Sequence, residues 1–371
     1  MFYRDTWAEI NLDAIAHNIQ EIRKNNHRKL IAVLKANAYG HGDYWVAKTA
    51  IEQGACMVAV AYLDEAIGLR KQGFNDDILV LGHIRANDID LARFAKIKLT
   101  VISLAWLKQV IDLNLDLNGL QFHLKIDTGM NRIGLKDDEE ILEAISLIKQ
   151  HHGQLDGIYT HYHDADGELS YCDQQYQHFQ HVLSLLQEKP PYIHCENSAA
   201  ILQYNNDCTN AMRAGLLLYG LSPIETTLKL KPALSLYSRM THVKMVKKGE
   251  TIGYGATYTA KEDCFIATLP IGYADGFIRA NQGRSVIVND EEVEIVGRIC
   301  MDQCMIKLPH AYPINTKVAL INEKMPVSRI AKELNTIDYE ILCLLSDRIP
   351  RIVMKNQQPL AILNQRLHDF S

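Results

Sequence analysis

Short apolar runs alternate with amphipathic segments along the first two thirds of the chain. Eight runs read as buried strands, at residues 31–35, 57–61, 78–82, 99–102, 121–126, 155–160, 192–195 and 211–213. Segments with helical periodicity lie between them, the clearest at 43–54, 62–73, 137–150 and 171–189. Eight strands that alternate with helices are what a closed (β/α)8 barrel requires, so we predict an α/β barrel rather than an open doubly wound sheet.

The pattern changes after Lys231 and Pro232. From residue 233 onward, β-branched and aromatic residues alternate with polar ones and are interrupted by Gly, Asn and Asp. We therefore predict a barrel over residues 13–232 followed by a mostly β domain over residues 233–371. Residues 1–12 also alternate before Asp13, which we expect to cap the first helix, so this segment is predicted to be a strand that packs with the β domain.

Composition narrows the class of protein. The 371 residues are 47% hydrophobic and 22% charged, which is typical of a globular protein large enough for two domains. A net charge of −5 without a large Lys/Arg cluster argues against a nucleic-acid partner. Arg4, Asp5 and Glu9 lie where a signal peptide would need an apolar core, and no apolar run reaches membrane-spanning length. We expect a cytoplasmic protein that does not bind membranes.

The cysteines give little sign of a disulfide framework or a metal site. There are eight, scattered through mostly apolar contexts without a CxxC pair, which predicts reduced, buried thiols. Cys300 and Cys304 are four residues apart, but they lack two further ligands nearby, so the signal for zinc is weak.

Unusual polar residues gather where the predicted barrel strands end. A lysine directly after an apolar run loses hydration, which is costly unless its nitrogen is used. In (β/α)8 barrels the chemistry lies at the carboxyl ends of the strands. The residues found there are Lys35, Lys125 to Arg132 (KIDTGMNR), His161 to Asp164 (HYHD), His194 to Ser198 (HCENS), and Arg213 with Gly215.

Eight segments resemble the motifs of one enzyme family in their order along the chain. AVLKANAYGHG, at residues 32–42, resembles the pyridoxal-phosphate motif of the alanine racemase family. The others are KIDTGMNRIG, GIYTHY, ENSAA, MRAGLLLYG, GYGATY, GYADG and GRICMDQ. The resemblance implies a barrel followed by a β domain, and a homodimer whose active sites combine both subunits. It also implies an isomerase that interconverts L- and D-alanine and supplies D-alanine for peptidoglycan.

The resemblance assigns roles to individual residues. Lys35 would link to the aldehyde of pyridoxal 5'-phosphate and act as one base, and Tyr254 of the partner subunit would act as the second base on the opposite face of Cα. His161 and Arg213 match the polar chain beside these bases. Arg213 would face the pyridine nitrogen and leave it unprotonated, because a guanidinium cannot accept a proton.

Further residues match the family's binding positions. Lys125 matches a lysine that is often carbamylated and then orients the arginine matching Arg132; a simple salt bridge between Lys125 and Asp127 is the alternative. The positions implied to bind cofactor are Tyr39, His161, Asn197, Ser198, Arg213, Gly215 and Leu216, and those implied to bind substrate are Arg132, Met301 and Tyr273.

One position departs from the family. Many members read SYRVPR near the carboxyl end, whereas this chain reads SDRIPR, with Asp347 in place of the tyrosine. A carboxylate cannot replace a phenol as a donor to phosphate. Asp347 also leaves room and offers an acceptor near the substrate Cβ, so serine is an alternative substrate and Asp347 the candidate specificity residue.

Two alternatives belong to other classes of protein. A binuclear metal hydrolase would use HYHD and a carbamylated lysine, but in such barrels the HxH pair precedes the lysine, whereas Lys125 precedes His161 here. A non-catalytic pyridoxal-phosphate carrier would need only the barrel. Such a carrier has no use for a β domain with GYGATY, so Tyr254 distinguishes the two.

Overall fold

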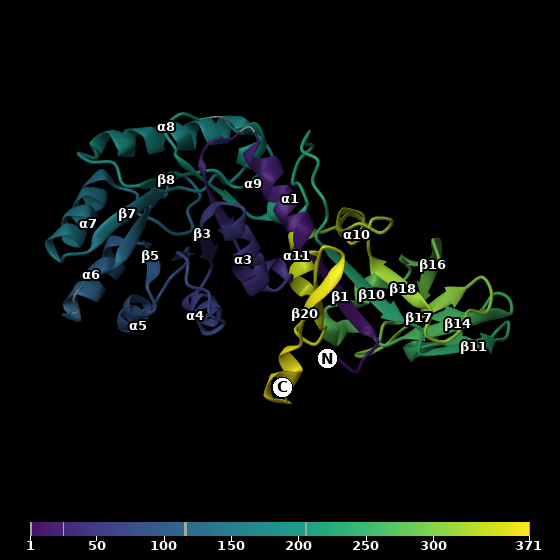
Figure 1. Cartoon of the computed structure of the whole chain (residues 1–371). Helices are drawn as coiled ribbons and strands as arrows, with labels where there is room; N and C mark the ends of the chain where they lie inside the picture. The colour runs from purple at the N-terminus through teal and green to yellow at the C-terminus, as the bar shows by residue number, and fades with distance from the viewer. Residues whose placement is uncertain (1, 25, 115–116, 205, 371) are drawn as a thin grey trace. The chain divides into compact units, whose positions relative to one another are not determined.

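The computed structural model describes residues 2–24, 26–114, 117–204 and 206–370 (Figure 1). The chain divides into two compact units. The barrel unit comprises Ile15–Ala38 and Asp43–Lys231, and the β unit comprises Met1–Ala14, Tyr39–Gly42 and Pro232–Ser371.

Eight parallel strands close into a barrel in their order along the chain, and β9 pairs back with β2. Each predicted run overlaps one of these strands, so the closed barrel is confirmed. Their apolar residues are buried on both faces because helices cover the outside of the barrel. The strands are β2 (Lys29–Val33), β3 (Ala55–Val60), β4 (Ile78–Val80), β5 (Ile97–Val101), β6 (Gln121–Lys125), β7 (Gln154–Tyr159), β8 (Tyr192–His194) and β9 (Ala211–Ala214).

The helices of the barrel unit follow from amphipathic periodicity. In α7, for example, Ile141, Ala144 and Ile148 recur at helical spacing and are buried. None of the helices within the described ranges has the length and apolarity needed to cross a membrane. The predicted segments form α3 (Asp43–Glu52), α4 (Leu63–Lys71), α7 (Asp138–Gln150) and α8 (Leu169–Leu185). The barrel unit also contains α5 (Ile89–Phe94), α6 (Leu104–Asp112) and α9 (Ser198–Gln203).

The first helix, α1 (Leu12–Arg23), is capped two residues earlier than we predicted. The side chain of Asn11 accepts a hydrogen bond from the Ala14 amide at 3.1 Å, as an N-cap does. The expectation that Asp13 is the cap is wrong, because Asp13 already lies in the first turn. Its carboxylate instead accepts a hydrogen bond from the Asn356 amide at 2.7 Å.

The β unit is built on a ten-stranded sheet with the order β11-β14-β17-β16-β15-β18-β10-β1-β19-β20. The N-terminal strand lies inside this sheet, antiparallel to β10 and parallel to β19. The strands are β1 (Thr6–Asn11), β10 (Leu234–Arg239), β11 (His242–Val246), β14 (Cys264–Leu269), β15 (Ser285–Val288), β16 (Glu291–Val296), β17 (Cys304–Leu308), β18 (Lys317–Ile321), β19 (Arg351–Lys355) and β20 (Gln358–Leu363), beside a separate pair, β12 (Thr251–Ile252) and β13 (Tyr258–Thr259).

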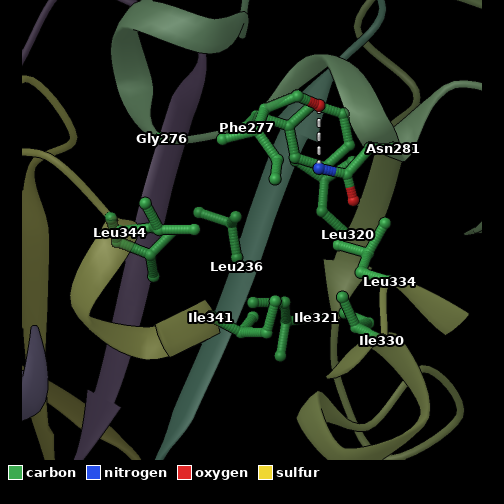
Figure 2. Close-up of a pocket in the computed structure, with 12 residues that line it drawn as sticks. Leu236, Gly276, Phe277, Asn281, Leu320, Ile321, Ile330, Leu334, Ile341 and Leu344 are labelled. Carbon is green, nitrogen blue, oxygen red and sulfur yellow. Dashed lines mark hydrogen bonds between the residues drawn. The ribbon is translucent and has the colours of Figure 1, made fainter. Parts of the chain in front are cut away.

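Two short helices, α10 (Val327–Glu333) and α11 (Asp338–Leu344), pack within this unit. Together with β10 and β18 they enclose a cavity of about 20 Å³ (Figure 2). Leu236 and Leu320 face it from the strands, and Ile330 and Ile341 face it from the helices. The lining is apolar except for Asn281, and the space is about one water molecule in size, so this is a packing defect of the core rather than a ligand site.

We expect Leu236→Ala to lower the free energy of unfolding by about 2–5 kcal/mol, because the truncation enlarges a cavity that rigid neighbours cannot fill. Urea denaturation followed by circular dichroism measures this change. Leu360→Ala, at a side chain that is 46% exposed, is the control and should cost less than about 0.5 kcal/mol. Equal losses in the two variants would contradict the assignment of Leu236 to the core.

Candidate active site

The barrel brings the predicted polar residues together at one end. Lys125 is the last residue of β6, Arg213 lies in β9, and Lys35 and His161 follow β2 and β7 by two residues. Arg213 Nη2 donates to His161 Nδ1 at 3.2 Å. Burial and the positive charge of Arg213, with smaller effects of Arg132, Lys125 and Lys35, lower the pKa of His161 well below its usual value. The ring is therefore neutral at physiological pH and can accept this hydrogen bond.

Lys35 begins a turn of unusual backbone geometry. The next four residues, Ala36 to Tyr39, all have φ between 52° and 54°, the left-handed region that costs a non-glycine residue about 1–2 kcal/mol. Lys35 itself is exposed in the chain. The expectation that it is buried at the inner end of a strand is wrong, because β2 ends at Val33 and the left-handed turn presents Lys35 at the barrel mouth.

Glu65, in the first turn of α4, stabilises that turn. One carboxylate oxygen accepts the Ala36 amide at 2.6 Å, and the other accepts the amides of Ala61 and Tyr62 at 2.7 and 3.3 Å. The Asn37 side chain accepts the Asp43 amide at 3.0 Å. Hydrogen bonds to a charged acceptor offset part of the strain, so Glu65 holds the loops after β2 and β3 in one arrangement. Our sequence reasoning missed it, although the YLDE pattern before a helix was a signal.

Arg213 is buried, yet it has no carboxylate partner among the described residues. It makes five hydrogen bonds from Nη1 and Nη2, three of them to the carbonyls of Thr160, His194 and Cys195 and two to the rings of His161 and His194. These acceptors are neutral, so they satisfy the donors of the guanidinium but do not cancel its positive charge. It suits a neighbour that has a lone pair and no proton to give.

Lys125 is also buried, and its Nζ donates to the Ile126 carbonyl at 2.5 Å. The alternative of a salt bridge with Asp127 is not found, because Asp127 Oδ1 accepts the amides of Gly129 and Asn131 instead. Burial lowers the pKa of Lys125 to about 8. A sizeable fraction of this amine is therefore neutral and nucleophilic at physiological pH.

The loop that Asp127 organises carries Arg132. Its two amide hydrogen bonds to Asp127 fix the start of the loop, and Arg132 lies exposed beyond it. Among the described residues Arg132 has no ion-pair partner. A guanidinium in that state can bind an incoming carboxylate.

Neutral donors converge where β8 and β9 end. Ser198 is buried and its Oγ accepts the Gly215 amide at 3.1 Å. Asn197 caps α9 through the Ala200 amide at 3.0 Å, and Leu216 begins the 3-10 helix η2 (Leu216–Tyr219). The structure thus brings the Ser198 hydroxyl and the amides of Gly215 and Leu216 together without a lysine. The Gly215 amide donates to Ser198 Oγ here, so it would exchange that acceptor for an oxygen of a bound phosphate group.

In the β unit, Tyr273 and Met301 lie on two loops that are hydrogen-bonded to each other. The Tyr273 amide donates to the Cys300 carbonyl and the Ala274 amide donates to the Met301 carbonyl, both at 3.0 Å. Gly272 permits this contact, because a Cβ there would lie 2.3 Å from the Cys300 oxygen. Met301 is 54% exposed, so its outer face is accessible to a ligand.

Tyr254 is 70% exposed, on the tight turn η3 (Tyr254–Ala256) between two glycines with positive φ. It lines a surface hollow together with Cys300 and Met305. The phenol of Tyr254 is therefore accessible to a group that approaches from outside this turn.

The remaining two predicted residues also lie in the β unit. Tyr39 is buried, and its ring packs 5.8 Å from that of Tyr339. Asp347 is exposed on the loop after α11. Buried Arg351 fixes this loop by donating to the carbonyls of Leu345, Ser346 and Ile349.

Metal and disulfide chemistry find no support in the described residues. None of the eight cysteines forms a disulfide in the described structure. The described part of the chain contains no group of three or more His, Cys, Asp or Glu side chains that could hold a metal ion.

Comparison with known proteins then identifies the family. The model of the alanine racemase N-terminal domain matches residues 10–223, and that of the alanine racemase C-terminal domain matches residues 233–353. The chain belongs to the alanine racemase family. The alanine racemase of Anoxybacillus flavithermus is 49% identical over 98% of both chains, and that of Geobacillus stearothermophilus is 46% identical over 98% of this chain and 97% of its own.

Solved structures agree with this membership of the alanine racemase family. Alanine racemase from Bacillus anthracis with bound L-Ala-P superposes with a TM-score of 0.95 at 41% identity, over 100% of both chains. A histidine racemase from Leuconostoc mesenteroides also superposes, with a TM-score of 0.89 at 31% identity over 96% of this chain and 99% of its own. The fold therefore accommodates more than one amino acid, and specificity must come from individual side chains.

We expect Glu65→Ala to lower the free energy of unfolding by about 2–3 kcal/mol, because three amides lose a charged acceptor while the left-handed turn keeps its strain. Glu65→Gln should lose about half as much, since one amide oxygen remains. Urea denaturation measures both, with Asp64→Ala, at the exposed neighbouring position, as the control. If Glu65→Ala and Asp64→Ala are equally stable, Glu65 does not hold the turn.

Proposed function

We propose that this protein interconverts L- and D-alanine with pyridoxal 5'-phosphate as cofactor, in the cytoplasm, and supplies D-alanine for peptidoglycan. The membership of both domains in the alanine racemase family carries this proposal. The curated relatives at 42–49% identity are named alanine racemase, so the serine alternative is not favoured. The match of the C-terminal domain likewise argues against a carrier built on the barrel alone. Eight free cysteines are consistent with a reducing compartment.

The residues at the barrel mouth fit the proposed cofactor. The phosphate would be held by Ser198 and by the amides of Gly215 and Leu216, with Tyr39 and Asn197 as the further contacts that the family resemblance implies. Arg213 and His161 would contact the ring, and Lys35 would anchor it covalently. When bound, pyridoxal phosphate supplies an electron-withdrawing ring that makes the Cα proton of an amino acid acidic.

Two bases on opposite faces of Cα would then exchange the proton. We assign the first to Lys35 Nζ and the second to Tyr254 Oη. Tyr254 is 70% exposed and would reach the barrel of a second copy, so we propose a homodimer with shared sites. Arg132 would bind the substrate carboxylate, with the Met301 backbone and Tyr273 contributed by the β unit of the other subunit.

Asp347 is the residue we propose to influence specificity. It is exposed on a loop that Arg351 fixes, and its carboxylate would repel a phosphate dianion and accept a hydrogen bond from a substrate hydroxyl. This hydrogen bond would favour serine, since alanine lacks a side-chain hydroxyl. The relatives named alanine racemase argue for alanine instead, so we expect Asp347 to permit serine only as a minor substrate.

Purified protein with pyridoxal phosphate in D2O should exchange the Cα proton of L-alanine faster than that of L-serine and form the D-isomer, as followed by proton NMR. The reason is that the relatives at 42–49% identity are named alanine racemase. Faster turnover of serine would overturn the choice of substrate and make Asp347 the specificity residue. Exchange with neither amino acid would overturn the racemase itself.

The same assay tests the second base. Tyr254→Phe should retain cofactor absorbance and lower racemisation by about 10²–10⁴-fold, the usual contribution of a general acid or base. Tyr312→Phe removes a hydroxyl that donates to Glu291 in the β unit and should leave the rate unchanged. Full activity of Tyr254→Phe would remove Tyr254 from the mechanism.

We propose that Lys125 forms a carbamate, because CO2 reacts with a neutral amine and burial lowers the pKa of Lys125 to about 8. The fraction of Lys125 that is neutral increases as the pH rises through about 8. Carbamylation should therefore increase from about pH 7 to 9 at constant dissolved CO2. Bicarbonate labelled with ¹³C should give a carbamate NMR signal that Lys125→Arg abolishes. A signal that persists in Lys125→Arg would place the carbamate elsewhere.

A further inference from the structure

A chain of hydrogen bonds runs through the barrel interior from Arg213 to a carboxylate. Arg213 Nη1 lies 2.6 Å from His194 Nδ1, and His194 Nε2 lies 3.0 Å from His123 Nδ1. His123 Nε2 lies 3.2 Å from Asp156 Oδ2, which also accepts from Lys98 Nζ at 2.6 Å. All five side chains are buried, on β5, β6, β7, β8 and β9.

The direction of each hydrogen bond follows from the end that can only donate. A guanidinium has no acceptor, so His194 Nδ1 must accept and its proton must lie on Nε2. That N–H donates to His123 Nδ1, which places the proton of His123 on Nε2 as well. His123 Nε2–H then donates to Asp156. The chain therefore has one polarity, and both imidazoles have the same tautomer.

The surroundings of His194 keep it neutral. Burial, with the positive charge of Arg213 as the next cause, lowers its pKa well below the usual value. The ring of Tyr159 stacks on it at 4.7 Å, and Lys125 adds a smaller effect only while it is an unmodified cation. Burial and Arg213 are thus the main causes that oppose protonation of His194.

His123 faces groups of both signs. Lys98 and Asp156 lie at its Nε2 side, and the ring of Tyr192 packs 5.8 Å away. Burial lowers the pKa of His123 and outweighs the opposing hydrogen bond to Asp156. Burial alone raises the pKa of Asp156, but hydrogen bonds from His123 and Lys98 outweigh this, so the carboxylate is ionised. The anion accepts and cannot donate, which closes the chain at this end.

The fold makes specific room for the His123 ring. Gly157, on the adjacent strand β7, would place a Cβ 2.3 Å from His123 Nδ1 if it were alanine. The backbone of Gly157 does not have a positive φ, so glycine is not needed here for its conformational freedom. It is needed because it leaves space for the His123 ring. The His123 ring therefore occupies the space that a side chain at residue 157 would fill.

We propose that Asp156, acting through His123 and His194, is a positioning residue for Arg213: it fixes both imidazoles as Nε2–H tautomers so that His194 Nδ1 always presents a lone pair to the guanidinium. The inference rests on the proposed function, in which Arg213 faces the cofactor ring. Reversal of either tautomer sets an N–H against an N–H and displaces Arg213 from its carbonyl acceptors.

The tautomers can be measured in the protein without cofactor. Long-range ¹H–¹⁵N NMR of protein labelled with ¹⁵N-histidine should show Nε2 protonated and Nδ1 unprotonated in both rings. No titration is expected between about pH 5.5 and 9. His123→Gln and His194→Gln assign the signals. A proton on Nδ1 of either ring, or titration in this range, overturns the proposal.

Variants test whether the chain acts on Arg213. Gly157→Ala leaves every member chemically intact but displaces the His123 ring. It should change the His194 tautomer signal and lower kcat by about tenfold or more with a smaller change in KM. His123→Gln retains one donor and one acceptor and should be closer to wild type than His123→Leu. The control is His181→Leu, which removes an exposed imidazole 2.7 Å from Asp138.

The possible outcomes separate the two claims. Correct tautomers together with an inactive wild-type protein would refute the racemase and leave the geometry standing. Normal kcat in a folded Gly157→Ala protein whose His194 signal has changed would refute the positioning role and leave the racemase standing. If the variants do not fold, the wild-type tautomers still decide whether the chain has the proposed polarity.

Discussion

The burial of the Arg213 guanidinium without a carboxylate is the constraint on which this site depends. A buried charge is costly unless its donors are satisfied, and here carbonyl oxygens and imidazole nitrogens satisfy them. Neutral acceptors meet the need for hydrogen bonds but do not cancel the charge. The barrel mouth therefore retains a positive charge, and burial together with this charge lowers the pKa of His161.

The closed barrel supplies these acceptors because neighbouring strands end at the same rim. The carbonyls of Thr160, His194 and Cys195 come from the ends of β7 and β8, next to Arg213 on β9. No open strand edge could surround a side chain in this way. The nearest carboxylate in the hydrogen-bond chain, Asp156, is separated from Arg213 by two imidazoles, so it orients the cation without pairing with it.

The sequence allowed the barrel and most site positions to be predicted, for physical reasons. Buried parallel strands are continuous apolar runs, and their polar ends mark the rim. Contacts between side chains that are far apart in the sequence could not be predicted from it. The bond from Glu65 to Ala36, and the pairing of His123 with His194, depend on strand register and on the space above Gly157. The exposure of Lys35 was wrongly predicted because a left-handed turn of non-glycine residues has no signal in the local sequence.

The most direct test of this account is the protonation state of the cofactor ring. Purified protein reconstituted with pyridoxal phosphate labelled with ¹⁵N at the ring should show the nitrogen shift of an unprotonated pyridine at neutral pH. If Arg213 faces that nitrogen, as we propose, it can only donate to it, and its charge opposes a proton there. The shift of a protonated pyridinium would contradict the account, because Arg213 could not then face the ring nitrogen as a donor.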